Sequence, residues 1–254
     1  MNNLPNDLSE AIAHAYDATE AAIADGYTRV QIELVIPEIE LESQSLAQSF
    51  ISRMGDTAQN LKVLFPDTGA AALARRDWGE LPGYKVDDIG TSRSPVASRI
   101  EETDERFLLI APSAIEVAQV EKLCNLAGDR PVILLIPQLE DVSIVGIGYA
   151  ARQLRERFIS TLTTSYYFRP LEGLTIYRTY PGAWQIFSTQ TGEPAILQEL
   201  SQKPTGEALE KIMNELFEQT ATEATENSPE ASKPLPKKPG FLGELQKLMR
   251  ALTS

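Results

Sequence analysis

Residues 61–78 read LKVLFPDTGAAALARRDW, and this stretch decides the fold class. A short apolar run ends at Pro66, and an acidic residue, a glycine and an alanine-rich segment with two arginines follow it. This order predicts a strand, a turn and a helix. In many α/β proteins such a turn binds a phosphate at the helix N-terminus. The stretch therefore raises the question of a nucleotide site.

The residues of this turn do not match a phosphate loop. A P-loop needs two glycines and a lysine that reaches the phosphates, whereas this stretch has only Gly69 and no lysine after it. Asp67 at the helix start complements the helix dipole itself and would repel a phosphate. Arg75 and Arg76 lie one or two turns further along the helix. We interpret the stretch as a structural turn.

The same alternation of apolar runs and helical segments continues on both sides. Apolar runs typical of strands cover 28–37, 106–112 and 130–137. Helical spacing covers 7–25, 41–54 and 113–128, the last with a Ser113–Glu116 capping-box signature. Residues 79–98 read as loop. Strands that alternate with helices predict a mostly parallel sheet with helices on both faces.

After Arg157 the pattern changes. Strand-like segments follow one another with short turns between them, at 164–168, 174–180, 183–188 and 195–200. They predict an antiparallel meander that extends the parallel sheet. A closing helix is expected at 205–219. Residues 1–219 therefore form one α/β domain in this interpretation.

The remaining C-terminal residues divide into a linker and a helix. Residues 220–240 are rich in Thr, Glu, Pro and Lys, which predicts a disordered linker. Residues 241–254 predict an amphipathic helix. Its apolar stripe consists of Phe241, Leu242, Leu245, Leu248, Met249 and Leu252. Three placements stay open: a groove of a partner protein, an anionic membrane surface, and the chain's own α/β domain.

Composition excludes several classes of function. The net charge is −13 over 254 residues, which argues against nucleic-acid binding. One cysteine, Cys124, and one histidine, His14, allow neither an internal disulfide nor a multi-histidine metal site. Cys124 lies in a helical apolar pattern and is expected to be a buried thiol. We expect no catalytic residues, no metal and no cofactor.

Two weaker motifs also favour structural interpretations. The segment GIGYAA at 146–151 formally matches a dinucleotide fingerprint, but it follows most of the predicted parallel sheet. We expect it to be a plain helix start. The acidic run EETDE at 101–105 lacks the spacing of a calcium loop, and a solvated loop is expected.

One cluster of arginines and aromatic residues is the candidate binding patch. Arg152 and Arg155 share a helix face in ARQLRERF, and the strand that follows carries Tyr167 and Arg169. If this helix and strand pack together, these four residues form a surface for an anion or a partner protein. The alternative is a solvated helix face beside a core of aromatic residues.

Several segments together resemble one family of cyanobacteria and chloroplasts. They are LKVLFPDTGAAALARRDW, FLLIAPSAIEVAQVEKL, RPVILLIPQLED, ARQLRERF, SYYFRPLEG and YPGAWQIF, in this order. The family includes the plant Low PSII Accumulation factor, and a related domain is fused to a chloroplast adenylate kinase. The resemblance covers roughly residues 1–200.

The resemblance implies a non-enzymatic factor in photosystem assembly. Its implied partners are photosystem subunits or other assembly factors. No segment approaches the run of about 20 apolar residues that a membrane span needs, and the N-terminus lacks a signal peptide. We therefore expect a cytoplasmic protein in peripheral contact with the thylakoid. The alternative is a nucleotide-binding enzyme or regulator of adenylate metabolism, which the adenylate kinase fusion favours.

Overall fold

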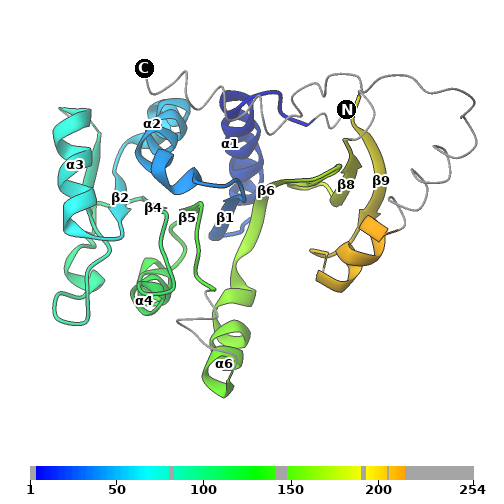
Figure 1. The fold of residues 1–254 in the computed structure, drawn as a ribbon. Helices are drawn as coiled ribbons and strands as arrows, with labels where there is room; N and C mark the ends of the chain where they lie inside the picture. Colours follow the sequence, from blue (N-terminus) through cyan, green and yellow to red (C-terminus); the bar gives the residue numbers. More distant parts are fainter. Residues whose placement is uncertain (1–3, 80–82, 141–147, 190–192, 205, 215–254) are drawn as a thin grey trace, which may run out of the picture.

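A nine-stranded sheet runs through the molecule in the order β3-β2-β4-β5-β1-β6-β7-β8-β9 (Figure 1). The computed structural model describes residues 4–79, 83–140, 148–189, 193–204 and 206–214. The strands are β1 (Arg29–Leu34), β2 (Leu61–Phe65), β3 (Tyr84–Asp88), β4 (Arg106–Ile110), β5 (Val132–Leu135), β6 (Thr163–Leu171), β7 (Leu174–Thr179), β8 (Trp184–Ser188) and β9 (Ala195–Leu200). The main helices are α1 (Leu8–Ala24), α2 (Ser43–Met54), α3 (Thr68–Trp78), α4 (Val117–Ala127) and α6 (Tyr149–Arg157).

The first six strands form the parallel part of the sheet. Strands β2 and β5 are buried along their whole length, and β4 is buried from its second residue on. Such continuous apolar strands are typical of a sheet that helices cover on both faces. The predicted mostly parallel α/β architecture is confirmed.

Helices cover the two faces of this part unequally (Figure 1). Helices α1, α2 and α3 contribute to the larger apolar cluster. The strands β1 to β8 each add to this cluster the apolar side chains of the same sheet face. Helices α4 and α6 pack on the other face through Val120, Leu123, Cys124 and Leu154. This second cluster contains Phe107, Leu109, Val132 and Leu134 of β4 and β5, so the second face is covered over these two strands.

The antiparallel part begins at β6, which pairs in parallel with β1 and antiparallel with β7. Strands β8 and β9 follow as a meander, which confirms the predicted extension of the sheet. On its second face, Tyr167, Ile176 and Trp184 form a small separate cluster with Leu209. Leu209 belongs to the helical residues 206–214, the described part of the predicted closing helix.

Two predictions about local structure are wrong. Residues 84–88 form strand β3 inside the stretch that we read as loop, and β3 pairs with β2 along its full length. Strand β3 stands at the sheet edge and contains polar residues, so its sequence lacks the apolar run that identifies the inner strands. Helix α4 begins at Val117 rather than near Ser113. The Glu116 carboxylate instead accepts bonds from the Ser113 N–H at 2.9 Å and hydroxyl at 2.7 Å, which closes a turn before the helix.

Strands β4 and β5 are each followed by a residue with left-handed backbone and then by a proline. The φ angles are 46° at Ala111 and 49° at Ile136. This region is costly for residues other than glycine, and more so for a β-branched one. The Ile136 N–H still donates to the Ile32 carbonyl at 2.8 Å, so the sheet holds the turn. Gln138, two residues further on, forms a parallel bridge with Ser113, so the chain after β5 runs beside the chain after β4.

Candidate functional site

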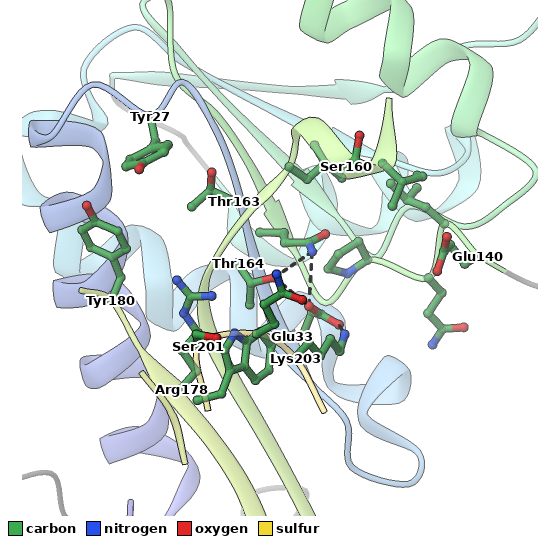
Figure 2. Close-up of a pocket in the computed structure, with 18 residues that line it drawn as sticks. Tyr27, Glu33, Glu140, Ser160, Thr163, Thr164, Arg178, Tyr180, Ser201 and Lys203 are labelled. Carbon is green, nitrogen blue, oxygen red and sulfur yellow. Dashed lines mark hydrogen bonds and ion pairs between the residues drawn. The ribbon is translucent and has the colours of Figure 1, made fainter. Parts of the chain in front are cut away.

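An open cavity of about 910 Å³ lies on the second face of the sheet, where the helical cover stops (Figure 2). We call it the sheet trough. Strands β1 and β6 supply its floor, the segment around Ser160 supplies one wall, and the meander supplies the other. Its lining includes Tyr27, Gln31, Glu33, Pro137, Gln138, Glu140, Ile159, Ser160, Leu162, Thr163, Thr164, Arg178, Tyr180, Trp184, Ser201 and Lys203.

The floor of the trough is a closed hydrogen-bond network around Glu33. Its Oε1 accepts from Gln31 Nε2 at 3.2 Å and from Thr164 Oγ1 at 3.0 Å. Its Oε2 pairs with Lys203 Nζ at 2.6 Å. Only 15% of the Glu33 side chain is exposed. The carboxylate is therefore neutralised and held in place, which suits a structural group better than a proton carrier.

Lys203 also covers aromatic rings. Its Nζ lies 4.5 Å from the centroid of the Tyr167 ring and 5.8 Å from that of Trp184. Both distances are in the range of cation–π attraction. Lys203 thus joins the segment after β9 to the floor and to the meander.

Arg178, on the wall formed by the meander, has no hydrogen-bond network like that of Lys203 among the described residues. It stands opposite Tyr167 on β6, and Tyr167 stands opposite Glu33 on β1, so all three project from the same face. The Arg178 Cζ lies 5.2 Å from the Trp184 ring centroid. Its Nε is buried and has no hydrogen-bond partner among the described residues. Burial lowers the pKa of the guanidinium from its ordinary value.

Two tyrosines close the end of the trough near the start of β1. Tyr27 and Tyr180 meet edge to face, with ring centroids 5.6 Å apart. The Tyr180 hydroxyl donates to Asp25 Oδ2 at 2.7 Å, and this bond is the main cause that raises the pKa of Tyr180 to about 12. Tyr27 is 44% exposed, so one aromatic ring remains open to the solvent at this end.

The opposite end lies beyond the carboxyl ends of β1 and β5. Pro137, Gln138 and Glu140 line it, and a second cavity of about 560 Å³ shares these residues and Glu33. Gln138 donates to the Glu40 carboxylate. Ligands of α/β sheets commonly bind outside the carboxyl ends of the strands, so this end agrees with the general rule.

The structure separates the predicted patch of Arg152, Arg155, Tyr167 and Arg169. Arg155 Nε pairs with Glu140 Oε1 at 2.7 Å, at the far end of the trough. Tyr167 is only 3% exposed and lies beneath Lys203. Arg152 is exposed on α6, and the Arg169 side chain hydrogen-bonds to Tyr167 on β6. The structure therefore brings Tyr167 and Arg169 together on the sheet, apart from Arg152 and Arg155 on α6.

The N-terminus of α3 is occupied by a carboxylate. Asp67 Oδ1 accepts from the Ala70 N–H at 2.9 Å, which caps the helix as the sequence predicts. Thr68 donates to Asp88 at 3.1 Å, and Arg75 donates to the Val86 carbonyl at 3.0 Å. These bonds tie α3 to β3. The turn in LKVLFPDTG therefore connects β2 to α3, and the Asp67 carboxylate occupies the helix N-terminus, where a phosphate would otherwise bind.

The other sequence motifs also have structural partners. Helix α6 begins at Tyr149, directly after Gly148, as expected for a helix start. In the acidic run, Glu101 pairs with Lys85, and the buried Asp104 accepts from the Glu101 N–H at 2.7 Å. No group of three metal-ligating side chains converges anywhere in the described ranges. The six residues of the predicted tail stripe lie outside them.

The two residues that composition singled out are both engaged. Cys124 is buried in α4, and desolvation raises the pKa of its thiol from 9.0 to about 12, which confirms the expected buried thiol. His14 Nδ1 lies 3.1 Å from the Tyr177 hydroxyl, and its Nε2 lies 3.8 Å from Glu10. Among the helices that the structure describes, none is long and apolar enough to cross a membrane.

The fold and the trough together define an α/β protein whose sheet carries an open polar cavity on one face. The family model for a Domain of unknown function (DUF1995) matches residues 5–211, which is most of the chain. This chain belongs to that family. The match spans all nine strands and every residue that lines the trough.

Sequence reasoning missed Arg178, Lys203 and Tyr27. A signal for the site was present in β1, which alternates apolar Val30 and Ile32 with polar Gln31 and Glu33. A strand in the middle of a parallel sheet is usually apolar throughout. Polar residues on one side of such a strand indicate a face that helices leave open.

Proposed function

We propose that this chain is a non-enzymatic auxiliary factor in the assembly of a photosynthetic membrane complex, with photosystem II as the first candidate. In this proposal the α/β domain holds a client or partner protein in the sheet trough. The resemblance to the family of the plant Low PSII Accumulation factor supports the role in assembly. Membership of the DUF1995 family is in agreement with that resemblance.

The observation that carries a binding role is the state of the charged groups in the trough. Glu33, the carboxylate at the floor, is neutralised by Lys203 and bonded by two further side chains. Three of the about four acceptor positions of this carboxylate are thereby used within the protein. Arg178, in contrast, forms no ion pair with a carboxylate of the described residues, and its buried Nε has no hydrogen-bond partner among them. The trough is thus arranged to receive a ligand group.

The C-terminal tail has a separate role in the proposal. An amphipathic helix with lysines before it provides weak and reversible attachment to an anionic membrane or to a partner. Such attachment would keep the factor near the thylakoid while assembly proceeds. Leu245→Glu combined with Leu248→Glu should release the protein from membrane fractions and leave the unfolding transition unchanged. Unchanged fractionation would show that the tail is not the tether.

The experiment that tests the assembly role is deletion of the gene in a photosynthetic host. Photosystem levels should fall while the transcripts of the photosystem subunits stay constant. Reintroduction of the wild-type chain should restore the photosystem levels. Normal photosystem levels in the deletion strain, under ordinary growth and under strong light, would contradict the proposal.

A thermal-shift screen separates the proposal from the nucleotide alternative. A nucleotide at about 100 times its Kd stabilises a protein by about 2.7 kcal/mol. We expect no shift with ATP, ADP, AMP or NAD(P), because Asp67 fills the position at α3 where a phosphate would bind. A saturable shift with one of these nucleotides would favour an enzyme or regulator of adenylate metabolism.

A further inference from the structure

We propose that the trough binds an extended segment of a protein through one of the segment's carboxylates, and that Arg178 is the group that receives this carboxylate. This inference rests on the proposed function, because it names the chemistry of the client segment. Lys203, Glu33 and the two tyrosines set the position of the segment around that contact.

The first argument is the incomplete bonding of Arg178. A guanidinium has five N–H donors in a planar fork that matches a carboxylate. The Arg178 fork packs against Trp184, and its Nε is buried without a partner. A buried donor that stays unbonded destabilises the protein. The Nε itself is closed to solvent, so the terminal Nη donors of this half-buried lining residue are the ones that face a ligand. Desolvation by burial also lowers the pKa of Arg178, against the opposing effect of Tyr180 and Tyr27.

The second argument is the balance of charge in the trough. Glu33 is paired with Lys203, and Glu140 is paired with Arg155. Arg178 is left as the cation without a carboxylate bonded to it among the lining residues that the structure describes. Arg178 therefore carries a local positive charge without a bonded carboxylate, although the whole chain has a net charge of −13. One carboxylate from a ligand restores neutrality at this point.

The third argument is the length of the trough, which favours a protein segment over a compact molecule. Its lining follows the chain from Tyr27, before β1, to Glu33 near the end of β1. Six steps of an extended strand cover about 20 Å. A segment of about five or six extended residues has this length. The second cavity at Gln138 and Glu140 continues in the same direction.

The fourth argument is the ring at the tyrosine end. Tyr27 is 44% exposed and is held by Tyr180, which is itself bonded to Asp25. An aromatic or apolar side chain next to the carboxylate would cover Tyr27 and gain favourable ring contact. We therefore expect the segment to pair an acidic residue with an aromatic neighbour.

The test uses Trp184 as a reporter inside the trough. The chain contains two tryptophans, and Trp78 lies on α3 against Phe65 and Tyr84, away from the trough. In a Trp78→Phe variant of the full chain, all tryptophan fluorescence comes from Trp184. The probe is the capped pentapeptide acetyl-Gly-Phe-Asp-Phe-Gly-amide, and its control carries Asn in place of Asp. Calorimetric titration of the unmodified chain gives a second measurement that needs no reporter.

We expect a saturable change with the Asp peptide below about 5 mM, and binding of the Asn peptide that is at least about tenfold weaker. Arg178→Gln should weaken the Asp peptide by at least about tenfold, and Arg178→Lys by less, because it keeps the charge but loses the fork. Arg76→Gln is the matched control, because Arg76 is exposed on α3 and pairs with Asp77. It should leave binding unchanged.

Three results would overturn the inference. They are no saturable change with the peptide, equal binding of the Asp and Asn peptides, and unchanged binding in Arg178→Gln. Sodium acetate or inorganic phosphate could also displace the peptide at a concentration equal to the Kd of the peptide. That result would show a site for simple anions instead. Capture of photosystem proteins by the Arg178→Gln chain as strong as by the wild type would remove this inference and leave the proposed function standing.

Discussion

The parallel and antiparallel parts of the sheet differ in how completely their faces are covered. In the parallel part, β2, β4 and β5 have helices on both sides and are apolar almost throughout. In the antiparallel part, β6 and β7 bury Tyr166 and Tyr177 on one face, while the other face turns Arg178 toward an open trough. The part covered on both faces buries apolar side chains, and the part covered on one face leaves polar side chains along the open trough.

The boundary between the two parts runs along β1. On one side β1 contributes Val30 and Ile32 to the main core, and on the other it contributes Gln31 and Glu33 to the trough. Binding sites at the margin of a rigid layer are held in place by the layer itself. The difference between the two parts can be tested by substitutions in each.

The largest effect is expected in the covered half. Leu134 on β5 is completely buried, and Leu134→Ala should lower the free energy of unfolding by about 3 kcal/mol, because the cavity cannot fill. Ile196→Ala on the edge strand β9, where 49% of the side chain is exposed, should cost less than about 1 kcal/mol. Urea denaturation of both variants measures the contrast. Equal losses would contradict the distinction between the two parts.

A pH effect of intermediate size is expected from Cys124. The fold keeps the thiol neutral, since burial raises its pKa from 9.0 to about 12. Its contribution is present below pH 9.0 and is lost as the pH rises toward 12, because the unfolded chain ionises first. Between about pH 8 and pH 10.5 the wild type should lose about 2 kcal/mol more than Cys124→Ala. The ionisation of tyrosines affects both chains equally and cancels in this comparison. Equal losses of unfolding free energy in the two chains would show that burial does not keep the thiol neutral.

A smaller effect of opposite sign is expected in the trough. Arg178→Met removes an incompletely bonded guanidinium and keeps an apolar side chain against Trp184. Arg178 is half-buried, and replacing an unpaired, partly desolvated charge by an apolar side chain is often neutral or stabilising. We expect the free energy of unfolding to rise by about 1 kcal/mol while peptide binding is lost. A loss of stability of similar size would show that Arg178 has a structural partner.

The smallest effect is expected at Lys203. Lys203→Gln breaks the exposed pair with Glu33, which should cost less than about 1 kcal/mol. The ammonium also covers Trp184, so the tryptophan emission should shift to longer wavelength as water reaches the ring. Fluorescence and urea denaturation of the same sample measure both quantities. An unchanged emission spectrum would show that Lys203 does not shield the trough.

The architecture was predictable from sequence because apolar periodicity is a local property. The runs at β2, β4 and β5 and the helical spacing of α1 and α2 identify the parallel part directly. The turn at Asp67 was also predictable, because a capping carboxylate is recognisable from its position before a helix. Strand β3 was missed because an edge strand with Lys85 and Asp87 lacks an apolar run.

The site could not be predicted as a set because its members come from distant segments. Glu33 and Lys203 are 170 positions apart and meet through the order of the strands. The patch predicted from sequence contains Arg155 and Tyr167 because of their spacing. In the structure Arg155 pairs with Glu140, and Tyr167 is buried. Only the alternation of Gln31 and Glu33 in β1 pointed to the open face.

The most direct test of the central claim is site-specific photo-cross-linking in a photosynthetic host. A photoreactive amino acid in place of Ser201, an exposed residue that lines the trough, reports which protein lies there. The same group in place of Leu73, exposed on α3, is the control. We predict that photosystem subunits or assembly factors are cross-linked from Ser201 and not from Leu73. The same proteins from both positions, or no photosystem protein from Ser201, would contradict a client-binding trough.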